Sequence, residues 1–123
     1  MDTQETTKLC VLIPALNEQA TIEQVIRSIP QNIPSINSRE IIVVDDGSKD
    51  DTAKIAKENG AVVIQHGNNR GVGAAFRTGI QEALKRGADI IVHIDGDGQF
   101  NALDIPKLIS PILDGSNDIT TCT

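Results

Sequence analysis

Two aspartates one residue apart, Asp95 and Asp97, follow the short apolar run of residues 90–94. A glycine comes after each of them, and Gln99 is next. A short apolar run that is rich in β-branched residues and closed by glycines is typical of a buried strand that ends in a tight loop. The carboxylates are therefore predicted to lie at the carboxyl end of a strand, where open parallel sheets bind their ligands.

Oxygen-bearing side chains in this pattern predict a cation site. Hard divalent ions such as Mg²⁺ and Mn²⁺ prefer carboxylate and phosphate oxygens. Asp95 and Asp97, with the amide oxygen of Gln99 as a neutral third ligand, would hold such an ion together with the diphosphate of a substrate. An isolated Asp-x-Asp also occurs in ordinary polar turns, so the rest of the chain has to distinguish the two interpretations.

Composition narrows the class of protein. The chain has 123 residues, of which 39% are hydrophobic, as expected for one globular domain or a piece of one. Its net charge is −6, and it has no run of Lys or Arg, which argues against a surface that tracks nucleic-acid phosphates. The same acidity means that an anionic substrate would need a metal.

Cysteine usage and hydropathy predict the compartment. Cys10 and Cys122 both lie in predicted strands and lack metal-ligand spacing, so they are interpreted as buried thiols of a reducing compartment. No signal peptide is recognisable, nor any apolar run near the ~18 residues of a membrane span. The expected location is the cytoplasm, at the cytoplasmic face of a membrane if a longer protein carries an anchor.

Strand and helix patterns alternate along the chain. Residues 1–7 are polar and predicted to be disordered, and residues 8–123 form the domain. Apolar runs predict strands at 9–13, 40–44, 61–64, 90–94 and 119–122, the first of them stopped by Pro14. Helical spacing predicts four helices. The first spans 21–29 and is opened by a Thr21/Gln24 capping box, and the second ends before Gly60. The third ends near Arg86 and has Leu84 on its apolar face, and the fourth spans 105–113 with a break at Pro111.

This alternation predicts an α/β fold, an open and mostly parallel sheet with helices on both faces. Right-handed crossovers and the usual doubly wound arrangement give a strand order of about 3-2-1-4-5. The loops 14–18, 45–48 and 95–99 then meet at one rim although they are distant in sequence. Because three carboxylate-bearing loops converge there, a ligand site is predicted at this rim.

Other polar and glycine-rich positions allow more than one interpretation. Gly71-x-Gly73 matches part of a dinucleotide fingerprint, but Phe76 occupies the position of the third glycine. The preceding Arg70 would be near enough to meet a phosphate. His66 is interpreted as a loop residue, and His93 as a satisfied core imidazole rather than a metal ligand.

Four segments carry a family resemblance: Pro14-Ala-Leu-Asn-Glu18, Val44-Asp-Asp-Gly-Ser-Lys-Asp50, Asn69-Arg-Gly-Val-Gly-Ala-Ala75 and Asp95-Gly-Asp-Gly-Gln99. In order and spacing they resemble the motifs of the family 2 glycosyltransferases, most closely the polyprenyl (dolichyl) phosphate sugar transferases. The resemblance covers residues 9–119 and corresponds to the N-terminal half of such a catalytic domain. It implies a GT-A fold, a nucleotide-diphosphate sugar donor and a divalent metal.

The resemblance also implies roles for individual residues. The residues that would hold the base and ribose are Pro14, Leu16, Glu18, Val44 and Asp46, with Asp46 accepting a hydrogen bond from the base. Those at the ribose, diphosphate and metal would be Asp95, Gly96, Asp97 and Gln99. Three positions depart from the family pattern. Leu16 replaces the aromatic residue found in much of this branch, Phe100 replaces a frequent histidine, and Asn101-Ala102 replaces an acid followed by proline.

The implied reaction is displacement at the anomeric carbon with inversion. Asp95 and Asp97 would be the catalytic residues, because the metal they hold neutralises the departing nucleoside diphosphate. A polyprenyl phosphate acceptor is already an anion and needs no general base.

Alternative functions stay open at this point. One is a truncated fragment that binds nucleotide sugar without catalysis, and the other is a nucleotidyltransferase-like or dinucleotide-dependent enzyme. If the chain ends at Thr123, its last strand is an open edge, which would favour a homo-oligomer.

Overall fold

The computed structural model describes residues 7–95, 105 and 119–121. Strands and helices alternate as predicted, and the elements in chain order are β1 (Lys8–Ala15), α1 (Ile22–Ser28), β2 (Ser38–Asp45), α2 (Thr52–Glu58), β3 (Val62–Gln65), α3 (Val72–Lys85), β4 (Ile90–His93) and β5 (Ile119–Thr121).

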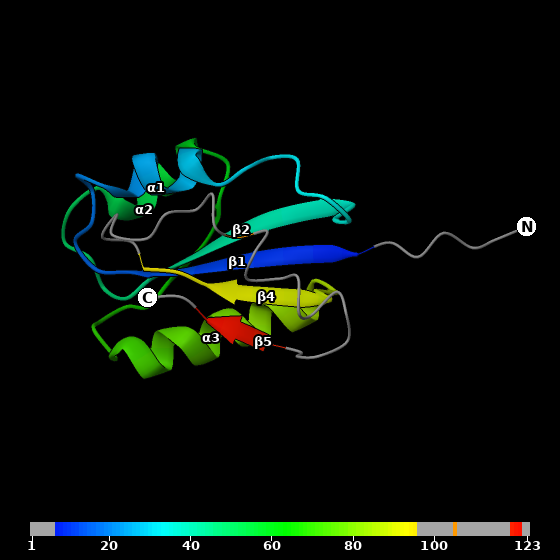
Figure 1. The fold of residues 1–123 in the computed structure, drawn as a ribbon. Coiled ribbons are helices and arrows are strands. Elements are labelled where there is room, and N and C mark those ends of the chain that lie inside the picture. Colours follow the sequence, from blue (N-terminus) through cyan, green and yellow to red (C-terminus); the bar gives the residue numbers. More distant parts are fainter. Residues whose placement is uncertain (1–6, 96–104, 106–118, 122–123) are drawn as a thin grey trace, which may run out of the picture.

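The strands form one parallel sheet in the order β3-β2-β1-β4-β5, which confirms the predicted topology. Helices α1 and α2 cover one face of the sheet and α3 covers the other (Figure 1). Since all strands run in the same direction, their carboxyl ends lie at one rim, on the left in Figure 1. The loops that carry the predicted site residues leave the sheet from this rim.

Alternation along β1 divides the core into two layers. Leu9, Val11 and Ile13 pack with α1, whereas Cys10 and Leu12 pack toward α3. All five are at most 1% exposed. A central parallel strand is buried on both faces, so its sequence reads as a continuous apolar run without polar alternation.

The structure corrects the predicted end of the first strand. β1 continues through Pro14 to Ala15, where Ala15 pairs with Asp45 of β2. The pairing of β1 with β4 ends at Leu12, whose carbonyl accepts from the Ile94 backbone N–H at 2.9 Å. Proline is tolerated after this point because the N–H that it lacks would have no strand to bond.

Two details of the predicted helices are also wrong. Thr21 precedes α1 but makes no side-chain cap bond; its hydroxyl donates to Glu18 Oε2 at 3.1 Å. Leu84 is 63% exposed, while Gly79 is buried on α3 in its place. At Gly79 an added Cβ would lie 3.1 Å from Leu12 Cδ1, so the helix approaches the sheet through a residue that no apolar pattern reveals.

The predicted terminal segments are described only in part. Of the segment 1–7 that is predicted to be disordered, only Thr7 is described, and its backbone N–H donates to Asn37 Oδ1 at 2.6 Å. Cys10 is a buried free thiol, as predicted, and Cys122 lies outside the described residues. Of the helix predicted at 105–113, only Ile105 is described, in a helix and fully buried. Across the part of the chain that the structure describes, no helix is long and apolar enough to cross a membrane.

Candidate functional site

A cavity of about 460 Å³ opens at the rim where the strands end. Its volume is in the range of small-molecule sites. The lining residues come from the ends of β1, β2 and β4, from the loop after β3 and from the start of α3: Pro14, Ala15, Leu16, Glu18, Asp46, Asn69, Gly71, Val72, Ala75 and Asp95. The structure thus brings together five of the residues predicted for the site, namely Pro14, Leu16, Glu18, Asp46 and Asp95.

Asp46 is the most firmly held acid in this cavity. Its Oδ1 accepts from the Arg70 backbone N–H at 3.0 Å and lies 2.7 Å from His66 Nδ1. Its Oδ2 accepts from the Gly71 backbone N–H at 2.8 Å. Burial raises the pKa of Asp46, but the hydrogen bonds from His66, Arg70 and Gly71 outweigh burial and hold this pKa below its usual value. Asp46 is therefore an anion that faces the cavity.

Apolar side chains form another part of the cavity wall. Val72 is 67% exposed and Leu16 is 37% exposed, and both line the cavity together with Pro14 and Ala75. Large apolar side chains left in contact with solvent beside a polar cavity are typical of a ligand-binding surface. Apolar walls next to a fixed carboxylate suit a flat ring that carries a hydrogen-bond donor on its edge.

Reciprocal hydrogen bonds fasten the loop after β1 to the loop after β2. The Asn17 backbone N–H donates to Ser48 Oγ at 2.8 Å, and Asn17 Oδ1 accepts from the Lys49 backbone N–H at 2.9 Å. One residue further on, the Glu18 backbone N–H donates to Thr52 Oγ1 at 2.8 Å. These bonds fix the backbone between Leu16 and Glu18, so the lining side chains on it keep their place.

A second close approach joins the loop after β2 to the loop after β3. Gly47 has φ +88°, and a Cβ built there would lie 2.7 Å from the backbone carbon of Asn68 and 2.7 Å from the backbone nitrogen of Asn69. Only glycine fits such a position. This contact places the backbone of residues 69–71 next to the Asp46 carboxylate.

Two predicted residues lie away from the cavity lining. Val44 is 1% exposed and belongs to the core beneath α3. Arg70 contributes its backbone N–H to Asp46, while its side chain is exposed and is not among the lining groups.

The predicted metal ligands are described only at Asp95, which is half-buried and lines the cavity. Gly96, Asp97 and Gln99 lie outside the described residues, so the metal site stays a prediction. Within residues 7–95, 105 and 119–121, no group of three or more His, Cys, Asp or Glu side chains is placed to hold a metal. The acids that do line the cavity, Glu18, Asp46 and Asp95, offer only oxygen donors. Oxygen donors fit Mg²⁺ or Mn²⁺ and not a thiophilic ion.

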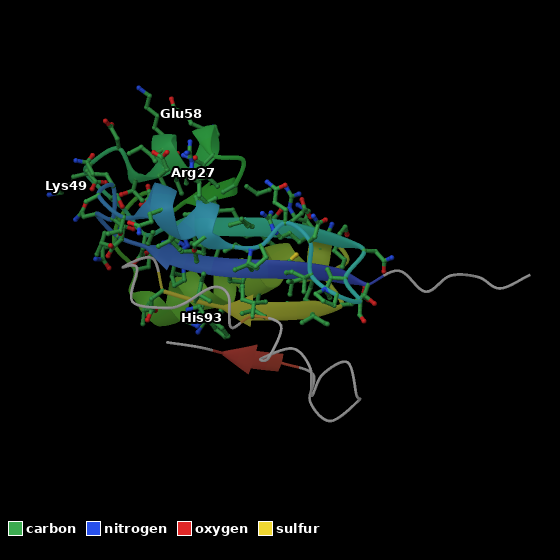
Figure 2. The ribbon with its side chains drawn as sticks, turned by 45° about the horizontal axis from the view of Figure 1, so that its top comes forward. Arg27, Lys49, Glu58 and His93 are labelled. Atoms are coloured by element: carbon green, nitrogen blue, oxygen red, sulfur yellow. The ribbon has the colours of Figure 1, made fainter. Side chains whose placement is uncertain are left out.

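The two histidines lie in different surroundings. His66 is in the loop after β3, as predicted, but it is only 8% exposed and bonds to Asp46, a partnership that the sequence does not reveal. His93 lies on the other face of the sheet from Arg27 of α1 (Figure 2), and its ring makes a T-shaped contact with Phe76 at a centroid distance of 5.1 Å. The His93 Nε2 atom is buried and has no hydrogen-bond partner among the described residues, so within them the satisfied imidazole that the sequence predicts is not found. Burial lowers the pKa of His93, partly opposed by the Asp95 charge.

Comparison with known proteins gives evidence of family membership that is independent of the site geometry. Residues 10–123 match the family model described as Glycosyl transferase family 2. The chain is 40% identical over 125 aligned positions to the UDP-N-acetylglucosamine--dolichyl-phosphate N-acetylglucosaminyltransferase of Methanococcus voltae, covering 88% of this chain and 48% of that protein. It is 28% identical over 118 positions to the polyprenol monophosphomannose synthase of Mycolicibacterium smegmatis, covering 91% of this chain and 43% of that protein.

A solved structure shares the fold. It is the glucosyl-3-phosphoglycerate synthase of Mycobacterium tuberculosis in complex with Mn²⁺, uridine-diphosphate-glucose and glycerol 3-phosphate, with a TM-score of 0.71 and 35% sequence identity. The match covers 89% of this chain and 41% of that one. This similarity confirms the GT-A fold expected from the sequence, and the chain spans less than half the length of each of these relatives.

Proposed function

Since the chain belongs to glycosyl transferase family 2, we propose that it binds a nucleotide-diphosphate sugar and provides the donor-binding part of a metal-dependent glycosyltransferase. The observation that carries this proposal is the shared cavity of Asp46 and Asp95, which follow β2 and β4 and are separated by β1 in the sheet. Two acids from separate strands at one apolar-walled cavity suit a ligand with a base at one end and a diphosphate at the other.

The nucleoside would occupy the end of the cavity near Asp46. Leu16 and Val72 supply apolar surface for the base, and Asp46 supplies a fixed acceptor for an N–H on its edge. Pro14 and Glu18 line the same cavity and would contact the ribose, in agreement with the roles that the family resemblance implies.

The diphosphate would lie toward Asp95. Asp95, Asp97 and Gln99 would hold Mg²⁺ or Mn²⁺, because carboxylate and amide oxygens are the ligands these ions prefer beside phosphate. Such an ion supplies Lewis-acid neutralisation of the leaving nucleoside diphosphate. The Mn²⁺ and uridine-diphosphate-glucose in the glucosyl-3-phosphoglycerate synthase complex support the pairing of a metal with this class of donor.

The acceptor that we propose is a polyprenyl phosphate, with inversion at the anomeric carbon. Two of the relatives are named for dolichyl phosphate and polyprenol substrates. A phosphate acceptor is already ionised, so attack on the sugar needs no general base from this chain. Because the chain covers less than half of either relative, transfer to the lipid is proposed for a whole protein of their length.

Calorimetric titration of UDP into the chain, with Mn²⁺ and then with EDTA, tests the proposal. We expect UDP to bind tightly only with Mn²⁺, and Asp97→Ala to remove the effect of the metal. Glu58→Gln is the matched control, because Glu58 is an exposed acid on the outside of α2 (Figure 2). UDP binding that is equal with Mn²⁺ and with EDTA would contradict the metal assignment.

A thermal-shift screen separates the remaining classes of ligand. Stabilisation by a UDP-sugar with Mn²⁺ supports the proposal, whereas stabilisation by a nucleoside triphosphate or NAD alone would favour a nucleotidyltransferase-like or dinucleotide-dependent enzyme. If the chain binds UDP-sugar but transfers no sugar to a polyprenyl phosphate, it is a donor-binding fragment.

A further inference from the structure

A row of three polar side chains, of which two are buried and Thr78 is half-buried, runs from α3 to the candidate site. Thr78 Oγ1 lies 2.8 Å from His66 Nε2, and His66 Nδ1 lies 2.7 Å from Asp46 Oδ1. The side chains of His66 and Asp46 are only 5% and 7% exposed. The row joins three separate elements, because Thr78 is on α3, His66 follows β3 and Asp46 follows β2.

The carboxylate determines how the neutral imidazole is protonated. An ionised Asp46 can only accept, so the proton between the two groups is on His66 Nδ1. The Nε2 atom of the neutral ring is then an acceptor, and the Thr78 hydroxyl donates to it. Asp46 therefore selects the tautomer of His66, and the hydrogen bond from Thr78 fixes the orientation of the ring that holds Asp46.

Counting acceptor positions shows what Asp46 has left for a ligand. The two oxygens of a carboxylate offer about four lone-pair positions. His66 and the Arg70 N–H occupy the two on Oδ1, and the Gly71 N–H occupies one on Oδ2. A single acceptor position on Oδ2 remains.

The same order of groups, hydroxyl to imidazole to carboxylate, occurs in nucleophilic triads. Here the hydroxyl end is not at the cavity: neither Thr78 nor His66 is among its lining residues, whereas Asp46 is. The carboxylate end of the row faces the ligand, so the row acts on Asp46 and not on a nucleophile.

We propose that His66 and Thr78 are positioning residues that leave Asp46 one acceptor position, and that the site thereby prefers a uracil base to guanine. This inference rests on the proposed function. Uracil presents one ring N–H between two carbonyl oxygens and needs a single acceptor. The guanine edge presents a ring N–H and an adjacent amino group, which together need two acceptor positions on a carboxylate.

Two substitutions at His66 separate its two hydrogen bonds. In His66→Asn the amide nitrogen takes the place of Nδ1 and keeps the hydrogen bond to Asp46. In His66→Gln the amide nitrogen takes the place of Nε2 and keeps only the hydrogen bond to Thr78. Both remove the ring, so each controls for the lost packing of the other. Thr78→Val removes the hydroxyl at nearly constant volume, and Thr78→Ser should restore it.

Calorimetry with UDP and with GDP, each with Mn²⁺, measures the base preference. We expect the wild-type chain to bind UDP more tightly than GDP. His66→Gln should lose about ten-fold in UDP affinity, which corresponds to about 1.4 kcal/mol, and its preference for UDP over GDP should narrow. His66→Asn should keep its UDP affinity and its preference for UDP over GDP within about three-fold of the wild type. Thr78→Val should lose less UDP affinity than His66→Gln, and Thr78→Ser should reverse this loss.

Nitrogen NMR of the imidazole rings tests the positioning without any ligand. The chain has only two histidines, so His93→Gln assigns the signals. We expect His66 to carry its proton on Nδ1, and Thr78→Val to change the Nε2 signal.

The outcomes of the calorimetry and the NMR contradict different claims. Unchanged UDP affinity in His66→Gln, or tighter GDP than UDP binding by the wild-type chain, would overturn the inference and leave the proposed function standing. A wild-type chain that binds neither nucleotide would overturn the proposed function and the base preference with it. A proton found on Nε2 of His66 would overturn the positioning itself. If His66→Gln fails to fold in a thermal scan, the UDP affinities of Thr78→Val and Thr78→Ser test the inference instead. Equal affinities in these two variants would overturn it.

Discussion

Asn17 and Lys49 are joined across 32 residues of sequence, because Asn17 Oδ1 accepts a hydrogen bond from the Lys49 backbone N–H at 2.9 Å. The Asn17 backbone N–H donates in return to Ser48 Oγ. Leu16 and Glu18, on either side of Asn17, line the candidate site. The site therefore depends on a loop-to-loop attachment made by a residue that does not itself line the cavity.

Replacing Asn17 tests this attachment. Asn17 has φ +54°, a left-handed conformation that Asn tolerates better than Ala does. We expect Asn17→Ala to lower the free energy of unfolding by about 1–3 kcal/mol, since it loses a hydrogen bond and strains the backbone. Asn17→Gly relieves the strain and loses only the bond, so it should be the less destabilised variant in urea denaturation. Equal stability of the wild type and Asn17→Ala would contradict this account of the loop.

Gly47 should be far less replaceable than Gly60. Both have positive φ, +88° and +90°, but an added Cβ meets the Asn68 and Asn69 backbone at 2.7 Å only at Gly47. Gly60→Ala should cost only the conformational strain, about 1 kcal/mol, whereas Gly47→Ala should cost more than twice as much. Gly47→Ala should also weaken UDP binding, because the displaced loop carries the donors to Asp46. Thermal unfolding and UDP titration of the two variants measure both effects, and similar losses in the two would show that the close approach is unimportant.

The sheet order and the meeting of Asp46 with Asp95 could be predicted from the sequence, because apolar runs and the rules for parallel crossovers determine which strand ends are neighbours. Positions that depend on hydrogen bonds across loops could not. Nothing in the local pattern distinguishes Asn17 from any polar residue before a helix, or His66 from any histidine after a strand. Their roles come from partners 32 and 20 residues away.

Packing explains a second kind of error. Periodicity placed Leu84 on the buried face of α3, but the helix touches the sheet through Gly79, which hydrophobic patterns ignore. A small residue at this point lets the helix lie close to Leu12 and Val44. The face of α3 that contacts the sheet is made of Ala75, Gly79 and Ala83, and Leu84 lies outside this face. Val44 is covered by the same helix, so its side chain is in the core and not at the rim.

Cys10 should make the fold sensitive to alkali. Burial, with a contribution from the nearby Glu40 carboxylate, raises the pKa of the Cys10 thiol from 9.0 to about 11. Below pH 9.0 the thiol is protonated in both folded and unfolded chains. Between pH 9.0 and about 11 the unfolded chain releases this proton and the folded chain keeps it, so stability should fall as the pH rises through this interval.

Urea denaturation of the wild type and Cys10→Ala over this interval isolates the effect. The variant should be less stable at neutral pH, because it leaves a small cavity in the core, but its stability should decline less from pH 9.0 to about 11. Parallel declines in the two proteins would mean that the Cys10 thiol ionises as easily in the folded chain as in the unfolded one.

An aromatic residue at position 16 should strengthen donor binding. Leu16 lines the cavity and is 37% exposed, so its side chain can be enlarged toward the ligand without disturbing the core. A ring stacked on the base would add about 0.5–1.5 kcal/mol, or roughly two- to ten-fold in affinity. Leu16→Phe should therefore bind UDP more tightly than the wild type in the presence of Mn²⁺, and Leu16→Ala more weakly. Leu84→Phe is the matched control, because Leu84 is also exposed but does not line the cavity. A gain of the same size in Leu84→Phe, or none in Leu16→Phe, would show that the base does not lie against Leu16.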